Sequence, residues 1–101
     1  MWILQSADEA TGPSLIFRMM PGTIKSVGRA PRADFIVDAA LVSRLHCRLT
    51  ATGDGLEVVD LDSTNGTFVN DQRVSKAVLA DGDRLRVGSV ELTICKVGET
   101  V

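Results

Sequence analysis

Residues 84–96 read Arg-Leu-Arg-Val-Gly-Ser-Val-Glu-Leu-Thr-Ile-Cys-Lys and carry the clearest sign of secondary structure in the chain. Apolar and polar residues alternate over 90–94, which is typical of a strand with one face in water. Gly88-Ser89 fits a two-residue type II′ hairpin loop, whose first position needs a positive φ that Gly adopts easily. The stretch therefore predicts two antiparallel strands, Arg84–Val87 and Val90–Lys96, joined by a tight turn.

The rest of the chain repeats this pattern of short apolar or alternating segments divided by turn residues, such as Pro21-Gly22 and Asn70-Asp71. No window of 11 residues shows a convincing helical stripe. Many short strands with frequent turns indicate an all-β protein, a sandwich or small barrel. The further expected strands are Trp2–Gln5, Ser14–Met20, Ile24–Gly28, Asp34–Val37, His46–Ala51, Leu56–Leu61 and Thr67–Val69.

Length and composition limit the class of protein. The 101 residues fit one domain, and 45% hydrophobic with 24% charged residues is close to the average for a soluble globular protein. The longest apolar runs are four residues. A transmembrane helix needs about 20, and a signal peptide needs an apolar stretch of about 7–15. We expect a soluble protein without membrane insertion, located in the cytoplasm, or in the nucleus in a eukaryote.

The charge is unevenly distributed along the chain. With 11 basic and 13 acidic residues the net charge is -2, which argues against general affinity for nucleic acid. Residues 1–50 carry a net +2 and residues 51–101 a net -4. A local cluster of cations in an acidic protein favours one small anionic ligand, and the alternative interpretation is a solvated surface. The basic excess lies around Lys25, Arg29, Arg32, Arg44 and Arg48.

The side chains do not suggest an enzyme or a metal site. His46 and Cys47 are neighbours on an expected strand and point to opposite faces, so they form no catalytic dyad. We expect Cys47 and Cys95 to be free, buried thiols, because a domain of this size needs no disulfide. A zinc site needs three or four ligands, and the sequence offers one His and two distant cysteines. A 12-residue calcium-binding loop is also missing from the sequence. We expect no cofactor and interpret the turn carboxylates as solvated: Asp60, Asp62, Asp81 and Asp83.

Three loop motifs stand out. Val27-Gly28-Arg29 ends a strand, Ser43-Arg44-Leu45-His46 leads into the next, and Asp62-Ser63-Thr64-Asn65-Gly66-Thr67-Phe68-Val69-Asn70 follows later. In this order on an all-β chain they resemble the forkhead-associated (FHA) domain, over about residues 24–94. The resemblance implies a single FHA domain over residues 1–101. Its fold would be a β-sandwich of two twisted, mostly antiparallel sheets with about 11 strands and its ligand loops at one end.

The resemblance also implies a function. FHA domains bind phosphothreonine peptides, so the chain is expected to mediate phosphorylation-dependent protein–protein interactions in Ser/Thr kinase signalling. Phosphothreonine carries about -1.5 to -2 charges and three strong acceptor oxygens. Arg29 offers a guanidinium fork for bidentate phosphate binding. Ser43 and Thr64 offer hydroxyl donors, and the Asn65 amide can both donate to and accept from a peptide backbone.

The remaining motif residues have supporting or open roles in this interpretation. Arg44 is either a second phosphate cation or a solvated charge. Gly28 lets the chain bend before the binding arginine, His46 braces the loops without gripping phosphate, and Gly66 is conformational. Asn70 shapes the turn after its short strand. We expect these four residues to support the site rather than touch the ligand.

Two questions stay open at the level of sequence. The alternative function is a phosphorylation-independent interaction or scaffold domain on the same fold. The second question is what the site recognises at the third residue after phosphothreonine, which family members read with the loop before Ser43. Here residues 38–42 favour an apolar side chain, whereas Arg44 or Arg32 would favour an acidic one.

Overall fold

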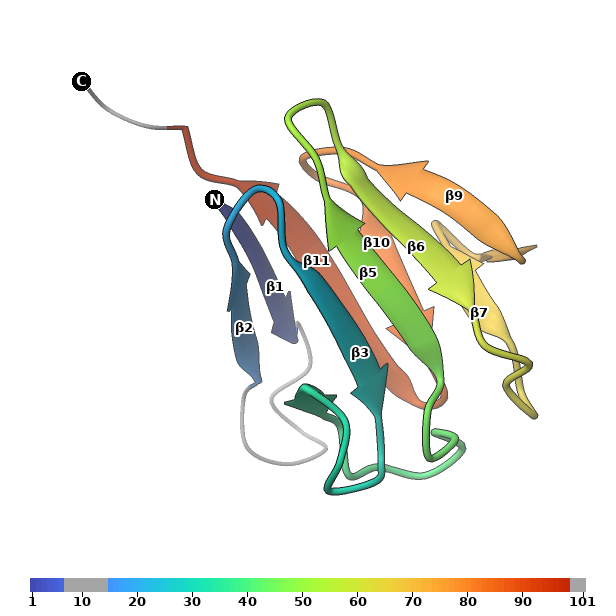
Figure 1. Ribbon diagram of the computed structural model, residues 1–101. Coiled ribbons are helices and arrows are strands. Elements are labelled where there is room, and N and C mark those ends of the chain that lie inside the picture. The colour runs from blue at the N-terminus through green and yellow to red at the C-terminus, as the bar shows by residue number, and fades with distance from the viewer. Residues whose placement is uncertain (7–14, 99–101) are drawn as a thin grey trace.

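The computed structural model describes residues 1–6 and 15–98, which form two β-sheets packed face to face (Figure 1). The six-stranded sheet has the order β2-β1-β11-β10-β7-β8, with bounds Ile16–Met19, Trp2–Ser6, Val90–Lys96, Arg84–Val87, Thr67–Val69 and Gln72–Val74. The five-stranded sheet has the order β4-β3-β5-β6-β9, with bounds Phe35–Ile36, Ile24–Gly28, Cys47–Ala51, Leu56–Asp60 and Lys76–Leu79. Within the described residues the paired strands run antiparallel except β3–β4, which is parallel. The predicted β-sandwich is confirmed.

The predicted hairpin of residues 84–96 has its expected bounds. Arg84 pairs with Thr93 and Val87 with Val90. Gly88 has a φ of 57°, as the first central position of a type II′ turn requires. Asn70 and Asp71 both have positive φ, 49° and 68°, which is the type I′ pattern. Asp in place of the more usual Gly therefore does not prevent that turn.

The nine predicted strands are all present within the described residues, although β2 starts at Ile16 and β4 is shorter than 34–37. Ser14 and the expected irregular stretch Ala7–Pro13 lie outside the described residues. Two strands, β8 and β9, were missed by the sequence interpretation. Both are sheet edges with mostly exposed or half-buried side chains, so their sequences carry no clear period-2 pattern.

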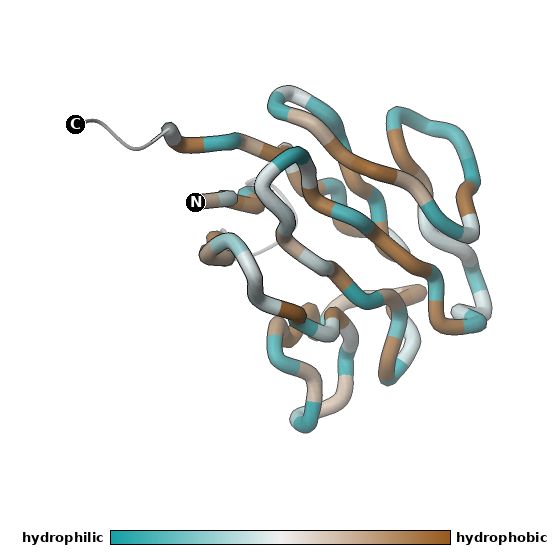
Figure 2. The backbone as a smooth tube through the Cα atoms, turned by 45° about the horizontal axis from the view of Figure 1, so that its top comes forward, coloured by the Kyte–Doolittle hydropathy of each residue, from teal (hydrophilic) through white to brown (hydrophobic). Residues whose placement is uncertain are grey.

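The core between the sheets is built from every second residue along the strands, the one whose side chain faces the opposite sheet. Leu85 and Val87 of β10 are fully buried. On β11, Leu92 is fully buried and Ile94 is 1% exposed. Figure 2 shows the matching alternation of hydrophobic and hydrophilic residues along the backbone. Burying one such side chain contributes about 1.5–3 kcal/mol. This aliphatic core gives the loops a rigid support.

Three long connections gather at one end of the sandwich, at the bottom of Figure 1: β3–β4, β4–β5 and β6–β7. The β10–β11 turn joins them there, because the Ser89 N–H donates to the Ala40 carbonyl over 3.1 Å. A Cβ on Gly88 would lie 2.6 Å from the backbone carbon of Leu41. The β10–β11 hairpin therefore also supports the β4–β5 loop.

Candidate functional site

Gly28, the last residue of β3, sets how closely two loops approach each other. A Cβ there would overlap the Arg44 carbonyl oxygen and lie 2.9 Å from Cα of Leu45. The close contact lets the Arg29 N–H donate to the Ser43 carbonyl over 2.9 Å, and the Ala30 N–H to that of Arg44 over 3.1 Å. Gly28 is therefore needed for close backbone approach rather than for a positive φ.

His46 ties the loops together from beneath. Its ring is fully buried. Nδ1 accepts from the Ser43 N–H over 3.1 Å, and Nε2 lies 2.8 Å from the Gly66 carbonyl oxygen. A carbonyl can only accept, so Nε2 carries the proton and Nδ1 is the acceptor of a neutral ring. Since both nitrogens are used within the protein, the expected bracing role agrees with the geometry.

Asp60, at the end of β6, anchors the β6–β7 loop. Its Oδ1 accepts from the Thr67 hydroxyl over 2.7 Å and from the Ser63 hydroxyl, and its Oδ2 accepts from the Ser63 N–H over 3.2 Å. Burial raises the pKa of this carboxyl, but the hydrogen bonds from Ser63 and Thr67 outweigh burial and leave the pKa below its usual value. The interpretation of Asp60 as a solvated turn carboxylate is therefore wrong. The signal was the Asp-x-x-Ser spacing, a local side-chain-to-backbone motif.

Gly66 closes the same loop in a conformation that favours glycine. Its φ is 90°, and its N–H donates to the Ser63 Oγ over 3.0 Å. A Cβ at this position would lie 2.7 Å from Nε of Arg73, which packs against the turn. The expected conformational role of Gly66 agrees with this arrangement.

The polar side chains at the rim keep unused hydrogen-bonding capacity. The Ser43 Oγ accepts from the Thr64 N–H over 3.0 Å, so the hydroxyl proton is left to donate elsewhere. The Asn65 Nδ2 donates to the Leu41 carbonyl over 3.1 Å, which leaves Oδ1 as an acceptor. Leu41 has a φ of 69° and is 59% exposed. Such a backbone conformation is costly for leucine, and strained residues of this kind cluster at functional sites.

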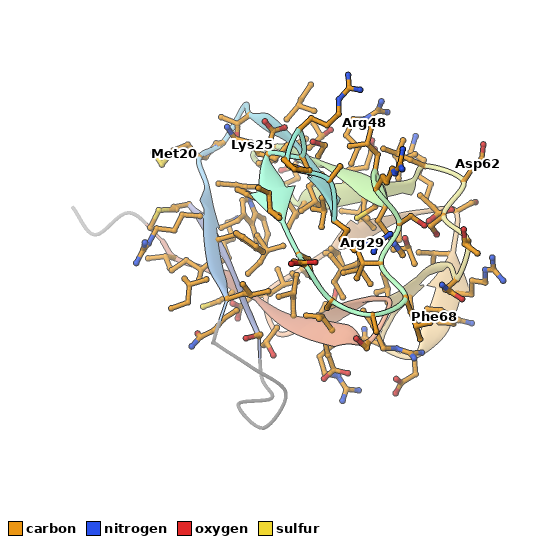
Figure 3. The ribbon with its side chains drawn as sticks, turned by 90° about the horizontal axis from the view of Figure 1, so that it is seen from below. Met20, Lys25, Arg29, Arg48, Asp62 and Phe68 are labelled. Atoms are coloured by element: carbon orange, nitrogen blue, oxygen red, sulfur yellow. The ribbon has the colours of Figure 1, made fainter. Side chains whose placement is uncertain are left out.

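The five expected binding residues surround one hollow of about 380 Å³. They come from three different connections, and the β4–β5 loop completes the wall with residues 39–42. Arg29 lies near the middle of this end in Figure 3, away from Arg48 and Phe68. The ion pairs found in the described residues involve neither Arg29 nor Arg44. The five expected binding residues that line the hollow are Arg29, Ser43, Arg44, Thr64 and Asn65.

Asn70 lies at the other end of β7 from Gly66, so its support of the site is indirect. The Arg84 N–H donates to its Oδ1 over 2.9 Å, and its Nδ2 donates to the Asp83 Oδ1 over 3.1 Å. These bonds fix the start of β10 against the turn that follows β7. Asn70 therefore holds the strand that carries the loop rather than the loop itself.

The two thiols differ. Cys47 is free and buried, and burial raises its pKa to about 12. Cys95 is free but exposed, so its expected burial was wrong: it follows Ile94, and neighbouring residues on a strand face opposite ways.

Among residues 1–6 and 15–98 there is no cluster of three or more side chains suited to a metal. In the same ranges no helix is long and apolar enough to cross a membrane.

Fold and loops together define a β-sandwich domain with a cation-lined hollow at one end. The sequence matches the FHA domain family over residues 25–88, more than half of the chain, so the chain belongs to that family. It is 43% identical over 67 residues to the glycogen accumulation regulator GarA of Mycolicibacterium smegmatis, covering 66% of this chain and 42% of GarA. The chain spans less than half the length of the curated relatives it matches.

Solved structures agree with this assignment. The FhaA FHA domain, in complex with the intracellular domain of Rv3910, superposes with a TM-score of 0.82 at 33% identity, covering 93% of this chain and 99% of that one. An FHA domain studied for phosphothreonine-dependent interactions superposes with a TM-score of 0.81 at 34% identity, covering 97% and 98%. Both comparisons extend over nearly the whole chain.

Proposed function

We propose that this domain binds phosphothreonine peptides in the 380 Å³ hollow and thereby recruits proteins that a Ser/Thr kinase has phosphorylated. The observation that carries the proposal is one hollow lined both by Ser43, whose hydroxyl proton is left to donate, and by two arginines without an ion-pair partner among the described residues, Arg29 and Arg44. The relative studied for phosphothreonine-dependent interactions supports it.

The chemistry of the hollow fits a phosphate group. Arg29 provides two parallel N–H donors for two phosphate oxygens, and the Ser43 hydroxyl donates to an oxygen as well. Charge-assisted hydrogen bonds contribute about 1.5–3 kcal/mol each. Two or three of them supply much of the roughly 8 kcal/mol that a micromolar affinity needs. Arg44 adds a second positive charge, and the Thr64 hydroxyl adds a further donor.

The peptide around the phosphothreonine is held by the rim of the hollow. The Asn65 Oδ1 is placed to accept from a peptide N–H, because its Nδ2 is already fixed to the Leu41 carbonyl. Ala39, Ala40 and Leu41 form an apolar stretch of the wall. We therefore propose an apolar preference at the third residue after phosphothreonine. Enrichment of Asp or Glu there in a peptide library, abolished by Arg44→Ala, would overturn this preference.

We propose binding without catalysis. His46 uses both ring nitrogens inside the fold, and Cys47 is a buried thiol with a pKa raised to about 12, so neither serves as base or nucleophile. The chain would act as one module, since β1 and β11, from opposite ends of the described residues, pair side by side. An exposed free thiol at Cys95 is suited to the reducing cytoplasm, where we place the protein.

The test is a pair of binding titrations by fluorescence anisotropy, with one peptide carrying phosphothreonine and its match carrying threonine. We expect saturable binding of the phosphorylated peptide and none of its match. A phosphate-mimicking Asp peptide is a useful third ligand, because it lacks the dianionic charge and the third oxygen. Equal affinity for the first two peptides would refute the proposal and favour a phosphorylation-independent interaction domain.

A further inference from the structure

A second, larger hollow of about 600 Å³ adjoins the first on the side of the β3–β4 loop. The two hollows share Arg29 and Arg44, so these arginines line both. The volume lies within the range of about 300–1,000 Å³ found for ligand sites. The residues that line it are Arg29, Ala30, Pro31, Arg32, Asp38, Arg44 and Leu45.

The charge around this second hollow favours an anion. Its lining includes three arginines and one acidic residue, Asp38, and the ion pairs of the described residues include none of these four. The other acid of the β3–β4 loop, Asp34, does not line the hollow, and its carboxylate accepts from the Ser26 N–H over 2.8 Å and from the Ser26 hydroxyl over 3.1 Å. The residues that line the hollow therefore carry an excess of two positive charges, three arginines against one aspartate.

The backbone beneath the hollow is fixed. The Ala30 N–H donates to the Arg44 carbonyl over 3.1 Å, and the Ala33 N–H donates back to the Ala30 carbonyl over 3.0 Å. Ala33 is 5% exposed and anchors the loop in the core. Pro31 lies between these bonds and restricts its own φ. A fixed loop holds Arg32 on the rim without the entropic cost of ordering a flexible segment.

We propose that this hollow is a second anion site, which takes a further phosphorylated side chain of the same peptide. The inference rests on the proposed function, because the first phosphate must place the peptide beside it. An Asp or Glu carboxylate of the peptide shares part of this chemistry. Phosphate is the better match, since its charge of about -1.5 to -2 and three acceptor oxygens can use several guanidinium groups at once. The domain would then read double phosphorylation.

The experiment starts from a peptide with one phosphothreonine. A first series adds a second phosphorylated residue at each position in turn on either side of the phosphothreonine. A second series carries Glu instead of that second phosphorylated residue. At one spacing we expect the second phosphate to tighten binding about tenfold, as one added charge-assisted contact would. Arg32→Ala should remove this gain and leave the affinity for the singly phosphorylated peptide unchanged. The matched control is Arg48→Ala, an exposed arginine on β5 that lines neither hollow.

The outcomes separate the two proposals. If the singly phosphorylated peptide binds and no spacing of the second phosphate adds affinity, the second site is refuted and the proposed function stands. Equal losses in Arg32→Ala and Arg48→Ala would show general electrostatic attraction and also refute the site. A gain from Glu as large as from phosphate would overturn the phosphate assignment. If neither peptide binds, both proposals fail.

Discussion

Replacing Gly28 by alanine tests the geometry of the site without touching a ligand-binding group. The added Cβ would overlap the Arg44 carbonyl oxygen and lie 2.7 Å from its carbon. These are backbone atoms, so no side chain can turn away to make room. The end of β3 and the start of the Ser43–His46 segment must therefore separate.

The expected loss of stability follows from the contacts at that point. Overpacking costs about 1–3 kcal/mol. Separating the strands also strains the two hydrogen bonds from Arg29 N–H to Ser43 and from Ala30 N–H to Arg44, each worth about 0.5–1.5 kcal/mol. The total, about 2–6 kcal/mol, is a large part of the roughly 5–15 kcal/mol that stabilises a typical domain. Any folded fraction should bind the phosphopeptide weakly, because Arg29 and Ser43 are no longer in register.

The assay is urea denaturation of Gly28→Ala beside Gly53→Ala, followed by titration with phosphopeptide. Gly53 lies in an exposed turn, and a Cβ there meets no atom within 4 Å. The control should stay within about 0.5 kcal/mol of wild type and bind normally. A Gly28→Ala protein as stable as the control, with unchanged affinity, would show that the close backbone approach at Gly28 does not hold the site together.

Three further predictions follow from the contacts beneath and around the site. His46→Ala leaves the Ser43 N–H and the Gly66 carbonyl without partners, which should cost about 1–3 kcal/mol each in a thermal melt; a variant that melts like wild type but fails to bind would make His46 a direct ligand. The Asp60 carboxyl has a pKa lowered in the folded state, so its stabilising effect is complete above its unfolded pKa of about 4 and is lost as pH falls through the lower folded value. In denaturation experiments across the acid range, the free energy of unfolding should fall less steeply with falling pH in Asp60→Asn than in wild type. Identical pH dependence in the two proteins would contradict this. Phosphothreonine should bind about fourfold more tightly than phosphoserine, because a buried methyl group is worth about 0.8 kcal/mol; equal affinities in matched titrations would exclude a methyl pocket.

The sequence predicted the fold well where one face of a strand is buried. The 84–96 hairpin alternates clearly because Leu85, Leu92 and Ile94 must enter the core. The edge strands β8 and β9 were missed because most of their side chains face water. Such strands do not need alternating apolar residues, so their sequences show no clear pattern. Periodicity reports burial and not hydrogen bonding between strands.

The expected binding residues could be named from sequence because their motifs are local, and the structure brings them to one hollow, but their surroundings could not be predicted. Arg29, Ser43 and Asn65 were named from short stretches that resemble a known family. The role of Asp60 depends on hydrogen bonds to Ser63 and Thr67, which only the folded loop brings to one carboxylate. The hollow beside Arg32 depends on how two loops pack, and sequence spacing contains no record of that.

The affinities of Arg29→Ala and Arg29→Lys for one phosphothreonine peptide show whether the Arg29 guanidinium binds the phosphate. Arg29 is exposed, so both variants should unfold like wild type in urea. Losing two charge-assisted hydrogen bonds should weaken binding of the alanine variant by about a hundredfold or more. The lysine variant should also bind more weakly than wild type, because a point charge cannot make the bidentate contact. Wild-type affinity in the alanine variant would show that Arg29 does not bind the phosphate.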